Sequence, residues 1–452
     1  MPARPVRVFD VDMTTAVEPA LRVAVVGAGP AGLYTTDALL QQDSVPVRVD
    51  VLDRLPTPFG LLRYGVAPDH LKIKSVAKVL QRVLDDERVR LFGNVCLGTD
   101  ATVADLRARY HAVVYAFGTE GDRKLGVPGE DLFGSMSARE FVAWYSGHPE
   151  FDLPPGLLDT SAAAVIGVGN VAVDVARVLG KRPDDLAQTD MPDDVLAVLR
   201  GSAITDIHML GRRGPGAVKF THKELRELGE VPGLDVVVDP AELVLPEAEE
   251  KALPRGTAQM LATLREWSTR PLTGAPRRLH LRFGVRPTAM LGTDRVETLR
   301  VQGAAGTQDL PVGVVLRAVG YLGIPVPDVP FDADRGVVPT LEARVLRDGD
   351  ASPGEYASGW VSRGPVGVIG TNRSDGQLTA AAIRSDAAKL LQADLLEEDL
   401  LTLLTARDHL VVSCTGWRGI DQAEIARGTQ GGRPRVKIVP HADLLAAAGL
   451  VG

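Results

Sequence analysis

The spacing of apolar residues changes along residues 21–40, LRVAVVGAGPAGLYTTDALL. The first part, LRVAVV, is rich in valine and predicts a buried strand. After the glycine-rich letters GAGPAG, apolar residues return at helical spacing, at Leu33, Ala38 and Leu39. This stretch therefore predicts a strand, a tight turn and a helix in that order.

The same change of spacing recurs at residues 162–179, AAAVIGVGNVAVDVARVL. A buried strand is again followed by a turn, Gly167-x-Gly169-x-x-Ala172, and by an apolar helix. An internal repeat of this unit predicts two dinucleotide-binding folds in one chain, and hence two dinucleotides. The expected fold class is α/β, with two Rossmann-like domains.

Each glycine of the first turn has a separate task in such a fold. Gly27 permits the turn, Gly29 lets the backbone approach a pyrophosphate, and Gly32 lets the helix pack closely on the strand. Free N–H groups and the positive end of the helix then face the phosphates. The candidate contacts of the first dinucleotide are Gly27, Gly29, Pro30, Ala31 and Gly32.

The end of a later strand in each copy predicts which dinucleotide binds. The run VRVDVLD ends in Asp53, about 20 residues after Gly32, where a carboxylate accepts hydrogen bonds from a ribose 2′-OH. In the second copy, the strand within residues 204–214 ends in Arg212 and Arg213, and arginine accommodates a 2′-phosphate. The second dinucleotide is therefore predicted to be NADP.

The composition of the chain excludes several classes of function. With 452 residues, it exceeds what one hydrophobic core usually serves. Fifty basic against 58 acidic residues give a formal charge of −8, which disfavours nucleic acid and anionic membranes as partners. Cys96 and Cys414 lie too far apart for a redox CxxC pair, a zinc site or an iron–sulfur cluster of the chain's own. This use of cysteine predicts a reducing, cytoplasmic location.

The first 20 residues predict a short arm. They lack the apolar core of a secretory signal, and their three acidic residues argue against a transit peptide. Two later strands end in glycine, within residues 111–119 and 311–321, and we expect the chain to cross between domains near them. Residues 21–120 and 336–452 would then form the first dinucleotide-binding domain, with the second, residues 121–335, inserted into it.

The segment between the first copy and the next strand contains a long loop and a helix. Prolines and glycines across residues 54–70 predict an ordered loop. From Leu71 onward, helical spacing predicts one helix whose buried stripe consists of Ile73, Val76, Ala77, Leu80, Val83 and Leu84. Lys74, Lys78 and Arg82 share its other face.

Four longer motifs are more specific than either glycine turn: FGLLRYGVAPDH, VIGVGNVAVDVAR, GRRGPGAVKFTHKELREL and GWVSRGPVGVIGTN. With them the chain resembles the adrenodoxin-reductase type of ferredoxin:NADP reductase, as a bacterial-type member, from Val25 to Ile438. The resemblance implies a flavoprotein with FAD in the first domain and NADP in the second. It would pass electrons between NADPH and a small iron–sulfur protein, by hydride transfer from nicotinamide C4 to flavin N5 followed by single-electron steps.

The resemblance also implies roles for particular residues. FAD would bind the first glycine turn and Asp53, with its isoalloxazine ring against the loop that contains Leu61 and Leu62. The residues expected around NADP are Gly169, Asn170, Val171, Arg212, Arg213 and Glu224. Trp360 would flank the nicotinamide, and the backbone at Gly367, Val368 and Ile369 would approach the flavin.

The resemblance implies a proton path as well. His70 would lie near the flavin with a carboxylate from the KELRE sequence, Glu227, and the pair would carry a proton as the flavin is reduced. The residues alone leave another interpretation open, in which Asp69 caps a helix and His70 sits in its first turn.

A ferredoxin-type partner is expected on a basic patch at the rim of the cleft between the domains. Such partners are typically acidic and this chain is net negative, so productive encounter needs a local cluster of cations. The candidates are Lys74, Lys78, Arg226, Arg255 and Arg265. We expect a monomer. Two other functions stay open: an NADPH-dependent flavin monooxygenase, and a non-catalytic flavoprotein that senses NADPH.

Overall fold

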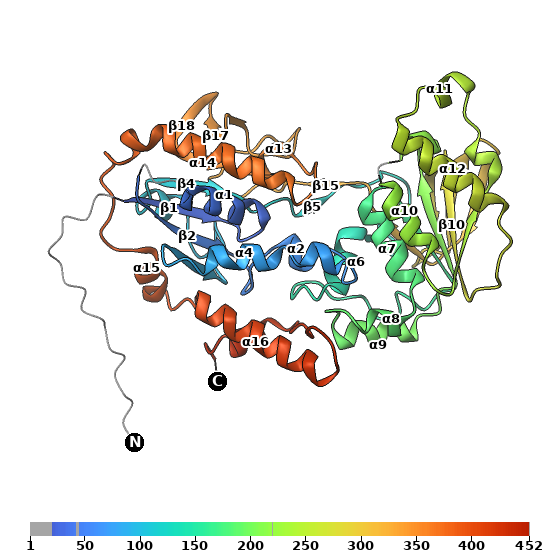
Figure 1. Ribbon diagram of the computed structural model, residues 1–452, viewed down its shortest axis with the longest axis horizontal. Helices are drawn as coiled ribbons and strands as arrows, with labels where there is room; N and C mark the ends of the chain where they lie inside the picture. The colour runs from blue at the N-terminus through green and yellow to red at the C-terminus, as the bar shows by residue number, and fades with distance from the viewer. Residues whose placement is uncertain (1–19, 42–44, 219, 452) are drawn as a thin grey trace.

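The computed structural model describes residues 20–41, 45–218 and 220–451. These residues form two bodies along the long axis of the molecule, each built around a sheet of its own (Figure 1). The arm predicted over residues 1–20 lies outside the described residues except for Ala20. Within the described part, no helix combines the length and apolar character that a bilayer crossing requires.

The first body contains a seven-stranded sheet with the order β16-β17-β18-β4-β1-β2-β3. Its strands are β1 (Leu21–Val26), β2 (Val47–Asp53), β3 (Val89–Gly93), β4 (Ala112–Tyr115), β16 (Thr340–Leu341), β17 (Arg344–Arg347) and β18 (Asp350–Ala357). Neighbours from β18 to β3 pair in parallel, and β16, β17 and β18 pair antiparallel. Its helices are α1 (Pro30–Leu40), α2 (Leu61–Tyr64), α3 (Leu71–Lys74), α4 (Ala77–Leu84), α5 (Val103–Arg107), α13 (Trp360–Arg363), α14 (Thr371–Leu390), α15 (Leu400–Ala406), α16 (Cys414–Gln430) and α17 (His441–Ala447).

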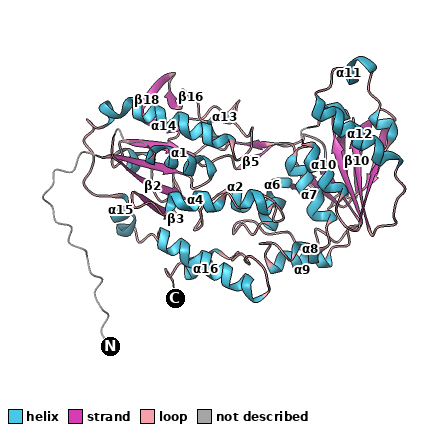
Figure 2. Cartoon of the chain, in the orientation of Figure 1, coloured by secondary structure: helices cyan, strands magenta, loops and turns pink. Residues whose placement is uncertain are grey.

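Alternate residues of β1 point to opposite faces of this sheet. Val23 and Val25 join a core to which α1 and α14 contribute, whereas Ala24 and Val26 join a second core on the other face. Helices flank the sheet (Figure 2), as parallel strands require. Burial on both faces explains why β1 is continuously apolar from Val23 to Val26.

The second body contains a six-stranded sheet with the order β6-β14-β7-β8-β10-β9, in which all neighbours pair in parallel. Its strands are β6 (Ser135–Ser137), β7 (Ala162–Ile166), β8 (Asp206–Gly211), β9 (Leu234–Val238), β10 (Arg277–Phe283) and β14 (Val314–Arg317). The accompanying helices are α6 (Ala138–Tyr145), α7 (Asn170–Gly180), α8 (Pro183–Leu186), α9 (Asp193–Gly201), α10 (His222–Gly229), α11 (Glu247–Lys251) and α12 (Arg255–Thr269), with 3-10 turns at Pro215–Ala217 and Pro240–Leu243. A three-stranded antiparallel sheet packs beside them: β11 (Arg286–Leu291), β12 (Thr298–Gly303) and β13 (Gly306–Pro311).

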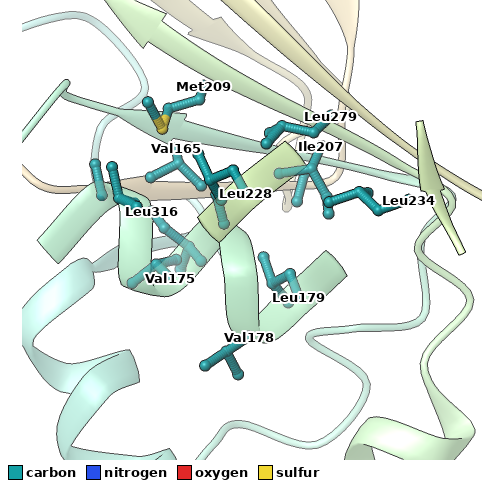
Figure 3. Close-up of a cluster of buried hydrophobic side chains, with 14 of the residues drawn as sticks. Val165, Val175, Val178, Leu179, Ile207, Met209, Leu228, Leu234, Leu279 and Leu316 are labelled. Atoms are coloured by element: carbon teal, nitrogen blue, oxygen red, sulfur yellow. The ribbon is translucent and has the colours of Figure 1, made fainter. Parts of the chain in front are cut away.

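One apolar core joins the six-stranded sheet to its helices (Figure 3). Val165 of β7 and Leu279 of β10 meet Val175 and Leu179 of α7 and Leu228 of α10. Each of these side chains is at most 3% exposed. The helix that follows the second glycine turn is therefore fixed on the sheet by its own apolar stripe.

The chain crosses between the two bodies twice, and the two crossings pair with each other. Strand β5 (Gly121–Asp122) lies antiparallel to β15 (Tyr321–Leu322). The last strand of the first body before this ribbon is β4, and the first one after it is β16. The ribbon supports our proposal that residues 121–335 are an inserted domain, between the two parts 21–120 and 336–452 of the first domain.

Three predicted elements differ in detail. The single helix expected from Leu71 is divided at Ser75–Val76 into α3 and α4, and Ile73 is 42% exposed instead of buried. The loop over residues 54–70 contains the short helix α2. The strand expected over residues 311–321 ends at Arg317 and resumes as β15, because the chain leaves the sheet there to enter the ribbon.

We expect Leu228→Ala to destabilise the second body by about 2–5 kcal/mol, because the fully buried leucine leaves a cavity. The measurement is the urea midpoint, followed by the fluorescence of Trp267 in the same core. The matched control is Leu272→Ala, whose side chain is 55% exposed and which should shift the midpoint little. Equal shifts for both variants would contradict the assigned core.

Candidate functional site

The first glycine turn is as tight as its sequence predicts. Gly27 has a φ of 114°, and a Cβ placed on it would lie 2.5 Å from the carbonyl oxygen of Ala116, at the end of β4. A Cβ on Gly32 would collide with the carbonyl of Gly27. In contrast, a Cβ on Gly29 would meet only Gly60 Cα, at 3.9 Å. Gly27 and Gly32 are thus required by the fold itself, and Gly29 faces open space at the N-terminus of α1.

Asp53 ends β2 directly beside this turn. Its carboxylate accepts hydrogen bonds from the Ala28 N–H at 2.8 Å and the Leu55 N–H at 3.0 Å. Burial raises the pKa of Asp53 to about 6, although both N–H groups and Arg54 favour the ionised form. The acid is therefore held at the mouth of the turn, where a ribose hydroxyl group would have an acceptor.

The loop after Asp53 closes over the turn. The Phe59 N–H donates to the carbonyl oxygen of Ala28 at 2.8 Å, and Gly60 lies against Gly29. Phe59 has a φ of 82°, which non-glycine residues rarely adopt. The strain is held by packing, since Phe59 is 6% exposed and its ring meets Trp417 edge-on at 5.7 Å. This loop leads directly into α2, which carries Leu61 and Leu62.

A distant segment forms the other side of the same turn. A Cβ on Gly359 would lie 2.5 Å from the Cβ of Ala31, so the backbone before α13 touches the first turn of α1. The following loop contains Gly367, with a φ of 88°, and Val368 and Ile369 before α14. Val368 is 65% exposed. The fold thus brings the start of the GWVSRGPVGVIGTN motif, at Gly359, to the first dinucleotide turn.

Trp360 carries an unsatisfied buried group. Its indole Nε1 has no hydrogen-bond partner among the described residues, and its ring meets Tyr321 with centroids 5.5 Å apart. Tyr321 belongs to β15, in the ribbon between the two bodies. Trp360 therefore lies where the first body meets the second, and its buried indole N–H is a donor that needs an acceptor.

The second glycine turn repeats the close approach of the first. Gly167 has a φ of 139°, and its added Cβ would lie 2.5 Å from the carbonyl oxygen of Ala318, just after β14. A Cβ on Gly169 would meet no atom within 4 Å. Asn170 and Val171 begin α7, and Asn170 is exposed. Both turns therefore hold their first glycine against a neighbouring strand end and leave the second glycine open.

Arg212 and Arg213 follow β8, the strand next to the second turn in the sheet. Both are exposed, and neither guanidinium pairs with an acid anywhere in the described ranges. Glu224, in contrast, is engaged: it accepts from the Thr221 N–H at 2.6 Å in the capping box of α10. The arginine pair thus remains available to an anion, while Glu224 has a structural task.

The carboxylate beside His70 is Asp174, not Glu227 as the resemblance implied. His70 Nε2 lies 2.8 Å from Asp174 Oδ1 and 2.8 Å from Arg177 Nη2. One tautomer cannot serve both contacts, because a protonated Nε2 donates to the acid and a bare Nε2 accepts from the arginine. Glu227 instead pairs with Lys223, one turn away on the surface of α10. The site can therefore hold a proton at His70, with a partner on α7.

Asp69, next to His70, forms ion pairs with the second body. It receives two hydrogen bonds from Arg177, at 2.8 and 2.9 Å, and one from Lys181 at 2.7 Å. Burial alone would raise the pKa of Asp69, but the two cations hold it below its ordinary value. Asp69 thus binds the second body and does not cap α3. The sequence carried a signal for this: Asp174 and Arg177 interrupt an otherwise apolar helix, Lys181 directly follows it, and charges at such positions need partners.

Three of the five predicted docking cations already have acidic partners. Lys74 lies 3.0 Å from Asp190 and is largely buried, Arg265 binds Glu250 with two hydrogen bonds, and Arg226 lies 3.5 Å from Glu230. Lys78 and Arg255 are exposed without an ion-pair partner in the described part of the chain. Lys74 in particular was wrongly expected on the surface, since its partner lies more than a hundred residues away.

An acid beside one glycine turn and two arginines beside the other are typical of oxidoreductases that hold two different dinucleotides. The comparisons with known proteins narrow this class. No family model matches the chain. The NADPH-ferredoxin reductase FprA of Mycobacterium leprae is 40% identical over 447 residues, which cover 94% of this chain and 97% of that protein. The mitochondrial NADPH:adrenodoxin oxidoreductase of Homo sapiens is 39% identical over 466 residues, covering 95% and 92%.

A solved structure agrees with these relatives. Mycobacterium tuberculosis FprA in complex with NADPH superposes with a TM-score of 0.89 at 39% sequence identity, over 95% of this chain and 99% of that one. Identity at this level over nearly the whole length establishes common descent. The chain belongs to the family of the NADPH-ferredoxin and adrenodoxin reductases.

Proposed function

We propose that this protein is a ferredoxin–NADP(+) reductase, which uses FAD to pass electrons between NADPH and a small iron–sulfur protein. The observation that carries the proposal is the pairing of two open glycine turns, one beside an acid and one beside two free arginines, in a chain that belongs to the reductase family. We also propose that the protein works as a monomer.

The first turn fits FAD. The open space before Gly29 accepts a pyrophosphate, Asp53 offers a carboxylate to the ribose, and the orphan Nε1–H of Trp360 is available to a carbonyl or hydroxyl group. Leu61 and Leu62 on one side, and the backbone at Gly367 on the other, would border the isoalloxazine ring. FAD supplies the redox chemistry when bound, because it accepts two electrons and releases them singly.

The second turn fits NADP. Gly169, Asn170 and Val171 present backbone N–H groups at the N-terminus of α7, where an anion is stabilised. Arg212 and Arg213 supply two planar, permanently charged donors for a 2′-phosphate. The chain's main contribution to the reaction is to hold the two nucleotides in register, since orientation supplies much of the rate of such a transfer. His70, between Asp174 and Arg177, would store the proton that accompanies reduction.

We propose that the iron–sulfur partner docks on the exposed face of α3 and α4. Lys72, Lys78 and Arg82 are exposed there, and no described acid pairs with them. Leu71, Ile73 and Val79 are 57%, 42% and 51% exposed among these cations. Exposed aliphatic side chains on the same short helices as cations suit a partner with an acidic rim and an apolar centre. The face begins directly after His70 and so borders the proposed flavin site.

The first test concerns FAD. Gly29→Ala adds a methyl group that the fold tolerates but that obstructs the pyrophosphate, so we expect a folded protein whose FAD affinity is at least ~10-fold weaker, or about 1.4 kcal/mol. The measurement is FAD titration of the deflavinated protein. Gly201→Ala, at an equally open helical glycine, should bind FAD normally. Full FAD occupancy in Gly29→Ala would exclude this site.

The second test concerns NADP. Arg212→Ala combined with Arg213→Ala removes two charge-assisted contacts, each worth about 1.5–3 kcal/mol, and should raise the KM for NADPH by roughly 100-fold or more. The KM for NADH, which lacks the 2′-phosphate, should change by less than about 3-fold. The control double variant is Arg48→Ala with Arg384→Ala, two exposed arginines elsewhere. Parallel losses with both cofactors would show that the pair has another task.

The third test concerns docking. Lys72→Glu combined with Lys78→Glu should slow reduction of an acidic ferredoxin by roughly 10-fold at about 0.01 M ionic strength, and salt should narrow the difference as the charges are screened. Ferricyanide reduction, which needs no docking face, should be unaffected. A charge-matched control, Lys251→Glu with Lys389→Glu, should retain ferredoxin turnover. Parallel loss of the ferredoxin and ferricyanide activities would rule out docking as the cause.

A further inference from the structure

A buried lysine joins three distant parts of the chain. Lys437 lies between α16 and α17, and its side chain is 1% exposed. Its Nζ donates to the carbonyl oxygen of Arg63 at 3.0 Å and to that of Ser146 at 2.8 Å, and lies 3.2 Å from Asp190 Oδ2. An ammonium group has three N–H donors, so these three contacts use all of them.

The three acceptors belong to different bodies. Arg63 lies in α2, directly after Leu61 and Leu62, on the loop that closes over the first glycine turn. Ser146 follows α6 and Asp190 lies between α8 and α9, and their chain neighbours Tyr145 and Met191 belong to the core of the six-stranded sheet. Lys437 therefore connects two parts of the molecule. One is the loop over residues 54–70, called the flavin loop below, and the other is the second body, called the NADP body below.

The neighbouring residues anchor the segment that carries this lysine. Arg433 binds the carbonyl oxygens of Thr189 and Met191 and the carboxylate of Asp193, on both sides of Asp190. On the opposite side, the Ile438 N–H donates to the buried carboxylate of Glu424, which also pairs with Arg63. The segment over residues 433–438 is thus tied to both bodies at once.

The position of Lys437 is costly, which argues that its charge has a task. Burial holds the pKa of Lys437 well below that of a free lysine, against the attraction of Asp190. Lys74 shares the same Asp190 oxygen, so one carboxylate serves two ammonium groups. An apolar side chain would avoid this cost, but it would supply no directional contacts across the junction.

We propose that Lys437 is a positioning residue that sets the register between the flavin loop and the NADP body, and thereby the alignment of nicotinamide with flavin. The inference rests on the proposed function and deepens it. Two of the three contacts of Lys437 are to backbone carbonyls, so it fixes main-chain positions and not merely side chains. A shift of ~1 Å between reacting groups can lower a rate by roughly 100-fold.

The test compares the holoenzyme with its Lys437→Met variant. Methionine retains much of the side-chain length and removes the three donors, while Lys74 still pairs with Asp190. We expect the rate at which NADPH bleaches the flavin, measured anaerobically by stopped flow, to fall at least ~10-fold, while the dissociation constant of NADP changes by less than about 3-fold. The long-wavelength absorbance of the enzyme–NADP complex should weaken, and amide hydrogen exchange at residues 189–193 should accelerate.

The control is Lys389→Met, which removes an exposed lysine at the end of α14 and should leave the four readouts unchanged. An unchanged bleaching rate in folded, FAD-loaded Lys437→Met would overturn the inference, even if its melting temperature fell. If that variant does not retain FAD, the bleaching rate is measured in Asp190→Asn instead. A decrease of at least ~3-fold supports the inference, and an unchanged rate overturns it. Absence of bleaching in the wild-type protein would instead refute the proposed function.

Discussion

Ion pairs across the junction between the two bodies are the constraint on which the site depends. Arg177 is 2% exposed and lies on the helix that begins at the second glycine turn, yet its partner Asp69 belongs to the first body. Arg177 also pairs with Asp174 on its own helix, whereas Arg177 and Lys181, the two cations bound by Asp69, both lie on the second body. A buried acid without its cations would cost several kcal/mol, so the bodies are stable together where these groups meet. The same contacts place His70 beside α7 and fix one turn relative to the other.

The two glycine turns have the same backbone design but lie beside side chains of opposite charge. In each copy the first glycine approaches the end of a neighbouring strand so closely that any side chain would collide with a carbonyl oxygen. In each copy a Cβ on the second glycine would meet no atom closer than 3.9 Å. What distinguishes the copies is the residue after a nearby strand: Asp53 is held by two N–H donors, and Arg212 and Arg213 have no acid to neutralise them among the described residues. Packing therefore makes both turns alike, and the charge beside each turn is what differs.

The partners of the charged residues were the part that sequence reasoning predicted least well. Helical spacing placed Lys74 and Lys78 on one polar face, but the helix is divided between them, so Lys74 turns to Asp190 and only Lys78 stays in solvent. Likewise, Glu227 has a nearer partner in Lys223, four residues away on its own helix, and His70 finds Asp174 instead. Local spacing identifies which residues share a helix face. It does not predict an acidic partner that lies in the other body.

The sequence by itself determined the two strand–turn–helix units, the close packing of their glycines, the exchange of an acid for arginines and the family, because each depends on residues close together in the chain. Buried parallel strands read as continuous apolar runs, and glycine is the residue that tolerates such close approaches, so both leave direct marks in the sequence. Only the tertiary structure decided how the halves of the site meet. Asp69 with Arg177, His70 with Asp174, Trp360 with Tyr321 and Lys437 with Arg63 are contacts across more than a hundred residues, or between bodies, and are fixed by the geometry of the junction.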